Sequence, residues 1–292
     1  MVSILIPTYN CAKYLPNALA SVLTQTYGDY EVLVIDDGST DGTAQVVAKF
    51  QDDFGGRLKY IYQENQGLAC ARNTAIENAK GTYLALLDAD DVWLPHRLKE
   101  TLHSMEADAQ IGLVHANIRC IDEQGKTIGV PHRDPAYLSG NIFDHIFVRR
   151  ADISCPTVLF RRECCEKVGL FDPNLARLGC EDRDLWLRIA RHYKIAYVHK
   201  VLALYRVSPA SMSRQRLKML QARLYVINKF CPPDSAHRGL RNEALAKVYR
   251  DLGDEALLAQ DFAEARRQYG RSIRLNPRGV WSWINFCKTI GK

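Results

Sequence analysis

The sequence predicts an α/β fold in which helices flank a mainly parallel sheet, followed by an all-helical segment. Two observations support this prediction. Over the first hundred residues, short apolar runs alternate with segments of helical periodicity, which is typical of consecutive β-α units around one sheet. Beyond residue 213 only the helical pattern continues. We therefore expect an α/β domain over residues 1–213, with halves at 1–100 and 101–213, and a helical tail over 214–292.

The first half is expected to contain strands that alternate with helices. The strands are Val2–Ile6, Glu31–Ile35, Leu58–Tyr62 and Thr82–Leu87. The helices are Tyr14–Thr24, Thr43–Phe50, Leu68–Ala79 and a helix from Pro95 to Met105. Proline suits the first turn of that last helix. Side-chain oxygens of Ser39, Thr40 and Asp41 are expected to cap the helix at 43–50.

The second half is less regular, and the tail is helical. The expected strands and helix are Gly112–Ile118, Thr157–Phe160, Ile195–Val198 and the helix Asp182–His192. Consecutive prolines at 232 and 233 predict the end of a helix.

The tail also has the spacing of one tetratricopeptide-like repeat. The matching residues are Tyr249, Leu252, Gly253, Ala265, Tyr269, Ser272 and Pro277. Trp283 lies 34 residues after Tyr249, which is the period of that repeat. One and a half repeats are too few to stack alone, so we expect the tail to pack on the α/β domain or to meet a partner. An ordinary helical hairpin without a recognition role is the alternative.

Composition places the chain among globular proteins. Of its 292 residues, 47% are hydrophobic and 25% are charged, as in ordinary soluble proteins. No run reaches the roughly 18 apolar residues that span a bilayer, and residues 2–7 lack the features of a signal peptide. The nine cysteines form no Cys-x-x-Cys pair, so we expect free thiols in a reducing compartment. A cytoplasmic protein without a nucleic-acid partner is therefore expected.

The charge is distributed unevenly. Residues 214–292 contain 16 Lys and Arg against 7 Asp and Glu, a net charge of +9, whereas residues 1–213 have 23 against 26, a net charge of −3. A basic tail suits peripheral contact with anionic lipid at the inner face of the membrane, or with a protein partner. A solvated helix face is the alternative.

The acidic run DADD at residues 88–91 follows an apolar stretch. In an extended chain alternate side chains share a face, so Asp88 and Asp90 are expected to point to one side and Asp91 to the other. Two such carboxylates suit Mg²⁺ or Mn²⁺, whose remaining positions go to water and substrate phosphates. The run therefore predicts a metal-bound diphosphate. An acidic turn that caps the helix near Pro95 is the alternative.

Polar clusters follow the first two expected strands, and open α/β sheets bind ligands beyond the carboxyl ends of their strands. Tyr9 is suited to stacking on a nucleobase. The carboxylates of Asp36 and Asp37 are suited to accepting the N3–H of uracil or thymine, or ribose hydroxyls. For Tyr9 the alternative is a simple turn, and for the two acids it is an Asp-Gly turn or a helix cap.

Two further clusters contain candidates for phosphate binding and proton transfer. Arg72 offers a fork of donors that suits phosphate, and a surface charge is the alternative. Asp182 is a suitable general base if it faces the metal site, because it could take the proton of an attacking hydroxyl. Acids that are stabilised by the dipole of a helix start are the alternative for this second cluster.

Together these clusters resemble the family 2 glycosyltransferases, inverting enzymes of the Rossmann-like GT-A fold. The matching stretches are VSILIPTYN at 2–10, LPNALASVLTQTYGDYEVLVIDDGSTDGT at 15–43, ENQGLACARNTAIENAKGTYLALLDADDVWLPHRL at 64–98 and GLFDPNLARLGCEDRDLWLRIA at 169–190. The resemblance covers residues 2–213. It implies a nucleotide-binding first half and an acceptor-binding second half.

The resemblance also implies roles for single residues at the donor site. Pro7, Tyr9 and Asp37 would hold the nucleoside, and Arg72 would lie near the diphosphate. Asp88 would lie near the ribose and the metal.

For the metal and the catalytic step, the resemblance implies that Asp90 is the closer metal ligand, Asp182 the catalytic base and Glu181 a residue that orients the acceptor. The chain departs from the family pattern at one point. After Tyr205 and Arg206 many relatives have a histidine that joins the metal, and here Ser208 stands in that region. The resemblance therefore supplies no third metal ligand at this position.

The resemblance predicts an inverting glycosyltransferase. A sugar would pass from a nucleotide-sugar donor, expected to be a UDP-sugar, to a hydroxyl of a glycan, lipid-linked or protein acceptor in polysaccharide or glycoconjugate synthesis. Mn²⁺ or Mg²⁺ would offset the charge of the leaving diphosphate. The alternatives are a non-catalytic nucleotide-sugar-binding or repeat-type scaffold protein, and a nucleotidyltransferase, which normally has a glycine-rich loop after its first strand.

Overall fold

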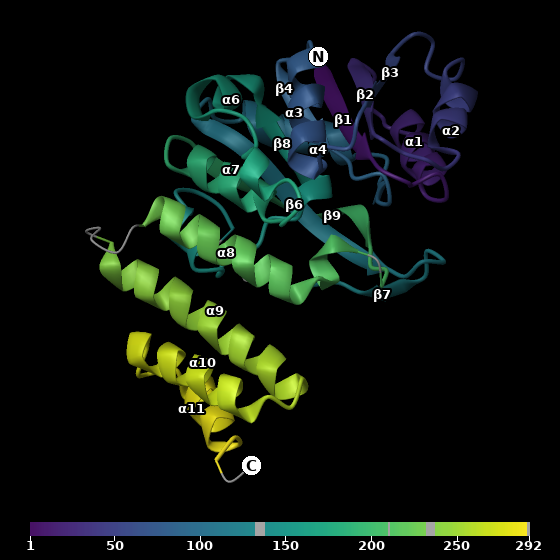
Figure 1. The fold of residues 1–292 in the computed structure, drawn as a ribbon. Helices are drawn as coiled ribbons and strands as arrows, with labels where there is room; N and C mark the ends of the chain where they lie inside the picture. Colours follow the sequence, from purple (N-terminus) through teal and green to yellow (C-terminus); the bar gives the residue numbers. More distant parts are fainter. Residues whose placement is uncertain (132–137, 210, 232–236, 291–292) are drawn as a thin grey trace. The chain divides into compact units, whose positions relative to one another are not determined.

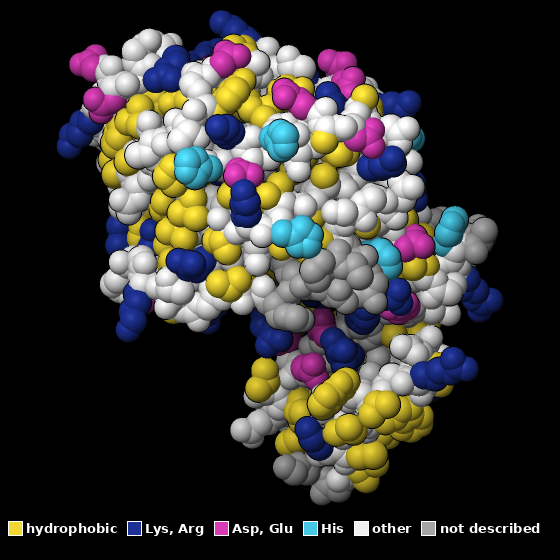
Figure 2. Space-filling view, turned by 180° about the vertical axis from the view of Figure 1, so that it is seen from behind, with side chains coloured by type: hydrophobic (Ala, Val, Ile, Leu, Met, Phe, Trp, Pro, Cys, Tyr) yellow, Lys and Arg dark blue, Asp and Glu magenta, His cyan; other side chains and the backbone are white. Residues whose placement is uncertain are grey.

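The computed structural model describes residues 1–131, 138–209, 211–231 and 237–290 (Figure 1). It divides into two compact units. The α/β unit comprises residues 1–143, 151–177 and 181–210, and the helical unit comprises residues 144–150, 178–180 and 211–292. Acidic and basic side chains are interspersed on the α/β unit in the view of Figure 2. Within the described ranges, no helix is both long and apolar enough to cross a bilayer.

One sheet forms the centre of the α/β unit. Among the described residues, its strand order is β3-β2-β1-β4-β8-β6-β9-β5, with β7 paired to β6. The strands are β1 (Val2–Thr8), β2 (Tyr30–Asp37), β3 (Leu58–Gln63), β4 (Tyr83–Leu86), β5 (Val92–Trp93), β6 (Ile111–Ile121), β7 (Thr127–Gly129), β8 (Leu159–Arg161) and β9 (Lys194–Arg206). β1 to β4 pair in parallel, whereas β8 is antiparallel to both β4 and β6. The predicted α/β fold is confirmed, with a parallel first half and a mixed second half.

The helices of residues 1–190 connect these strands. They are α1 (Leu15–Leu23), α2 (Thr43–Phe50), α3 (Leu68–Asn78), α4 (Arg97–Glu106), α5 (Phe143–Phe147), α6 (Arg162–Val168) and α7 (Glu181–Ala190). The sequence did not predict α5, α6, β5 and β7, because each is too short to show a clear period. The prediction for Pro95 was wrong in detail, since α4 begins two residues later.

The cap predicted for α2 is correct in one of its three residues. The Asp41 carboxylate accepts the backbone N–H of Thr43 at 3.0 Å. Ser39 and Thr40 instead hydrogen-bond to Asn10, in the loop that follows β1.

β9 is much longer than the four residues expected from its apolar run. It pairs in parallel with β6, and the register shifts at three places. Two of the shifts are adjacent, because Ala116 lies opposite Val198, Asn117 opposite Val201 and Ile118 opposite Ala203. Three residues of β9 are therefore unmatched, which makes a bulged stretch. The strand continues to Arg206.

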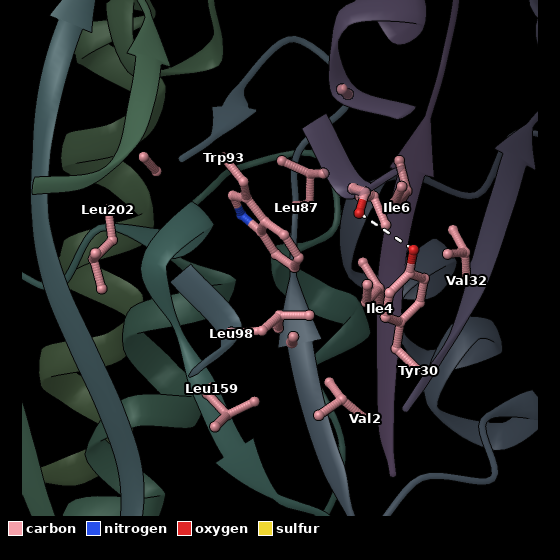
Figure 3. Close-up of a cluster of buried hydrophobic side chains, with 14 of the residues drawn as sticks. Val2, Ile4, Ile6, Tyr30, Val32, Leu87, Trp93, Leu98, Leu159 and Leu202 are labelled. Carbon is pink, nitrogen blue, oxygen red and sulfur yellow. Dashed lines mark hydrogen bonds between the residues drawn. The ribbon is translucent and has the colours of Figure 1, made fainter. Parts of the chain in front are cut away.

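The core on one side of the sheet combines β1, β2, α1 and α4 (Figure 3). Val2, Ile4 and Ile6 are fully buried there, as is Leu98 of α4. The polar atoms of its large aromatic residues are satisfied. The indole N–H of Trp93 donates to the carbonyl of Pro156 at 2.7 Å, and the Tyr30 hydroxyl donates to the carbonyl of Val22 at 3.3 Å.

The helical unit contains α8 (Arg216–Phe230), α9 (Arg238–Leu258), α10 (Phe262–Leu275) and α11 (Val280–Cys287). α9 and α10 pack closely, because a Cβ at Gly253 would lie 2.5 Å from the Tyr269 ring. The Tyr269 hydroxyl donates to Asp254 at 2.8 Å. The predicted helical tail is thus confirmed. The prolines at 232 and 233 lie outside the described residues, and the recognition role of the repeat stays a prediction.

Leu98→Ala tests the contribution of α4 to this core. Removing a fully buried leucine leaves a cavity, so we expect the free energy of unfolding to fall by about 2–5 kcal/mol. Denaturant unfolding followed by near-UV circular dichroism measures this loss. The neighbouring Lys99→Ala, an exposed position on the same helix, is the control. A Leu98→Ala protein as stable as the control would contradict the packing described.

Candidate functional site

Two loops lie beyond the carboxyl ends of β1 and β2 and bind each other. The Asn10 side chain accepts the backbone N–H of Thr40 at 2.8 Å, and the Ser39 hydroxyl accepts the backbone N–H of Asn10 at 2.9 Å. Asn10 adopts a left-handed conformation with φ of 49°. Next to it, Tyr9 is 54% exposed, so its ring is available to stack on a ligand. Pro7 is buried within β1.

The carboxylate of Asp37 already has three internal donors. Its Oδ1 accepts from the side chain of Gln63 at 2.7 Å and from the backbone of Gln66 at 2.9 Å. Its Oδ2 accepts the backbone N–H of Gly67 at 2.8 Å. Asp37 therefore fixes the segment that leads into α3. The expected contact with a nucleoside would have to share these oxygens.

Arg72 joins the acidic turn after β4 to the start of α7. Its guanidinium donates to Asp88 at 2.7 Å and to Glu181 at 2.6 Å, and it lies 5.4 Å from the centre of the Phe171 ring. The same nitrogen that binds Asp88 lies 3.1 Å from the sulfur of Cys155. Arg72 is 1% exposed. The alternative of a surface charge is therefore wrong. Both terminal nitrogens bind carboxylates, and the expected position of Arg72 near a diphosphate stays a prediction.

Asp88 and Asp90 lie in a turn and not in the extended strand that the sequence suggested. β4 ends at Leu86, and the backbone N–H of Asp91 donates to the carbonyl of Asp88 at 3.0 Å. Arg206, the last residue of β9, holds this turn. Its Nε donates to the carbonyl of Asp90 at 2.9 Å, and its backbone N–H donates to the Asp91 carboxylate at 2.8 Å.

The acids of this turn repel one another in a poorly solvated place. Burial and then the charge of Asp88 raise the pKa of Asp90 to about 6. Burial, Asp90 and Asp88 together raise the pKa of Asp91 well above its ordinary value. The Oδ2 of Asp91 is buried and has no hydrogen-bond partner among the described residues. A bound cation would relieve this repulsion, so the residues present fit a divalent metal ion.

The described residues contain no group of three or more His, Cys, Asp or Glu side chains that is arranged to hold a metal. An ion bound at Asp88 and Asp90 would therefore draw its remaining ligands from water and substrate oxygens, which is usual for Mg²⁺. Ser208, which stands where a histidine was expected, is buried.

Glu181 and Asp182 begin α7 in different surroundings. Glu181 is buried on Arg72, and desolvation raises its pKa to about 7 even though Arg72 lowers it. Asp182 is partly exposed, and its carboxylate accepts the backbone N–H of Arg183 at 2.6 Å. Desolvation also raises the pKa of Asp182, against the effect of Arg72. Asp182 therefore keeps part of its surface exposed, whereas Glu181 is held by Arg72. The role of Asp182 as base and the role of Glu181 in orienting the acceptor stay predictions.

Sequence reasoning missed Asn10, Cys155 and Arg206 as parts of the site. Cys155 has no neighbouring motif, so only the fold could bring it to Arg72. Arg206 follows an apolar strand that was expected to end eight residues earlier. Asn10 offered one signal, because asparagine tolerates left-handed turns.

Comparisons of the sequence agree with this arrangement. Glycosyl transferase family 2 matches residues 3–169. An uncharacterized glycosyltransferase of Nostoc sp. is 30% identical over 96% of this chain and 86% of its own length. The Escherichia coli protein WfgD, a UDP-Glc:alpha-D-GlcNAc-diphosphoundecaprenol beta-1,3-glucosyltransferase, is 31% identical over 79% of this chain and 86% of its own length. An uncharacterized glycosyltransferase of Rickettsia felis is 37% identical, and the match spans only 33% of it.

Solved structures share the fold. The S. aureus TarS 1-349 structure in complex with UDP-GlcNAc matches 99% of this chain and 90% of its own, with a TM-score of 0.67 and 19% identity. The mannosyltransferase PcManGT from Pyrobaculum calidifontis, in complex with GDP-Man and Mn²⁺, matches 98% and 86% with a TM-score of 0.62 and 21% identity. From the family match and the full-length relative together, the chain belongs to glycosyl transferase family 2 and is a glycosyltransferase.

Proposed function

We propose that this chain transfers a sugar from a UDP-sugar to an acceptor hydroxyl with inversion, using a divalent cation at Asp88 and Asp90. The observation that supports the proposal most directly is the double ion pair of Arg72. It places the acidic turn after β4 next to the start of α7, where Asp182 is accessible. Arg72 thus links the turn that carries the proposed cation ligands to the helix start that carries the proposed base.

In this proposal, Asp182 accepts the proton of the acceptor hydroxyl as the hydroxyl oxygen attacks the anomeric carbon. The bond from that carbon to the nucleoside diphosphate breaks on the opposite face, so an α-linked donor gives a β-linked product. A divalent cation, when bound, offsets charge on the leaving diphosphate. Arg72 binds both Asp88 and Glu181, and so fixes the position of the acidic turn at residues 88–91 relative to the proposed base.

The relatives support the donor and the acceptor of this proposal. The TarS structure contains UDP-GlcNAc, and WfgD is named as a UDP-glucose enzyme that acts on a diphosphoundecaprenol-linked sugar. We infer a uracil nucleotide held beside Tyr9, with Pro7 and Asp37 shaping the floor of the base site. We infer also a lipid-linked glycan acceptor on the side of residues 101–213, in glycoconjugate synthesis. The cytoplasmic position expected from the sequence stays a prediction.

A donor panel tests the proposal. Thermal unfolding is measured with UDP-, GDP-, dTDP- and CMP-sugars, each with and without Mn²⁺. A ligand at 100 times its dissociation constant adds about 2.7 kcal/mol to stability, and we expect this only for the UDP class with the cation present. A shift with another nucleotide would reassign the base. No shift with any of them would favour a non-catalytic scaffold.

Asp182→Asn tests the base. The amide keeps the size of the side chain and cannot take a proton, so we expect transfer to fall by about 10²- to 10⁴-fold while donor affinity changes by less than about twofold. Initial rates and donor titration measure the two effects. Asp152→Asn, an exposed acid that binds the neighbouring Arg183, is the control. A variant that transfers at close to the wild-type rate would remove Asp182 from the proposed role.

Asp90→Asn tests the charge repulsion among the carboxylates of the acidic turn at residues 88–91. The folded-state pKa of about 6 lies above the ordinary 3.8, so the stability that neutral Asp90 provides below pH 4 is lost as the pH rises through 6. Without cations, we therefore expect the variant to gain up to about 3 kcal/mol of unfolding free energy at pH 8 and nothing near pH 4.

Chemical unfolding at the two pH values measures this difference, with the exposed Asp53→Asn as the control. Added Mn²⁺ should stabilise the wild type at pH 8 and leave Asp90→Asn unchanged. If the variant gained no stability at pH 8, the ionised Asp90 would not destabilise the fold, which would contradict the repulsion described.

A further inference from the structure

Helix α11 is polar on the side that faces its own unit. Ser282 is 4% exposed, and its hydroxyl lies 2.8 Å from that of Ser272 in α10. The side-chain amide of Asn285 donates to Asp254 of α9 at 3.0 Å. Thr289, just beyond the helix, is fully buried. These three positions follow the spacing of one helical face.

The opposite side of α11 is apolar and exposed. Val280, Trp281, Trp283 and Ile284 in the helix, and Ile290 beyond its end, are between 42% and 67% exposed, and we call these five residues the α11 surface. An amphipathic helix of a globular protein normally buries its apolar stripe and exposes its polar side. In α11 this polarity is inverted. Contiguous exposed apolar residues of this kind mark interaction sites.

The α11 surface lies in a strongly basic segment. Residues 265–292 contain seven Lys and Arg and no Asp or Glu. The six of these that the structure describes are all exposed, and they are Arg266, Arg267, Arg271, Arg274, Arg278 and Lys288. In Figure 2, hydrophobic side chains gather on the helical unit, with isolated basic side chains among and beside them.

We propose that the α11 surface inserts into the interface of an anionic membrane. Tryptophan prefers the boundary between headgroups and hydrocarbon, and aliphatic side chains beside it enter the acyl region. The exposed basic side chains of this segment would meet the negative headgroups. Arg267, which pairs with Glu264, and Arg271, which lies over the Tyr249 ring, would contribute less. This inference goes beyond the proposed transfer reaction, because it requires neither donor nor metal.

Two other partners fit these residues less well. Nucleic acid would use the basic side chains, yet it offers no apolar phase for Val280, Ile284 and Ile290. A second copy would cover the apolar side chains, yet it would also bring two equally basic segments together, and like charges at an interface are unfavourable. An anionic lipid surface satisfies both features at once.

Vesicle binding by the full chain tests the inference. Flotation is measured with vesicles of phosphatidylcholine alone and with vesicles containing 30% phosphatidylglycerol. We expect binding at least tenfold tighter to the anionic vesicles, and a loss of at least tenfold in the Trp281→Ser/Ile284→Ser double variant. Leu258→Ser, at the end of α9 and 73% exposed, is the matched control and should bind like the wild type.

Tryptophan fluorescence distinguishes insertion from simple charge attraction. Of the four tryptophans, Trp93 and Trp186 are buried, so only Trp281 and Trp283 should respond to lipid. We expect a blue shift of their emission on anionic vesicles and quenching by brominated acyl chains. Binding without blue shift or quenching, equal binding of the double variant, or dimerisation that the double variant abolishes would each overturn the proposal. Loss of donor binding would not affect it.

Discussion

The site depends on one buried cation. Arg72 is nearly inaccessible to water and binds two carboxylates from distant parts of the chain, Asp88 after β4 and Glu181 at the start of α7. Removing charges from water is costly, and the cost is recovered only when every partner is in place. Loss of any of the three residues would therefore leave an uncompensated buried charge. One guanidinium thus sets the separation between the acidic turn and the accessible acid that follows Glu181.

Other contacts support this arrangement from the sheet. Arg206 at the end of β9 binds the carbonyl of Asp90, and Asn10 connects the loops after β1 and β2. Asp37 uses its carboxylate to hold the approach to α3, the helix that contains Arg72. Residues that look in the sequence like ligand contacts therefore also build the site. Several acids of the candidate site, Asp37, Asp88 and Glu181, thus already bind other residues of the protein.

The sequence predicted the regular part of this molecule well. The apolar pattern located β1 to β4 and α1 to α4, because strands such as β1 and β2 are nearly continuous buried apolar runs and the helices between them bury one face. It failed for β5 and β7, which are too short to show a period, and for the second half of β9, where a bulge interrupts the pattern. In the site, residue type selected the acids at 88, 90 and 182 as candidates. Their partners could not be predicted, since Arg206, which binds the carbonyl of Asp90, lies 116 positions away in the sequence.

The bulged stretch of β9 determines which face of the sheet the following side chains point to. Side chains alternate between the two faces of a sheet, so a one-residue slip in pairing turns every following side chain to the other face. Three unmatched residues lie between Val198 and Ala203, and Arg206 follows shortly afterwards. Gaining or losing a single residue here would turn Arg206 away from the carbonyl of Asp90, whereas a change of two would preserve its side. The number of residues in β9 before Arg206 can therefore change only by an even number if Arg206 is to keep holding the acidic turn.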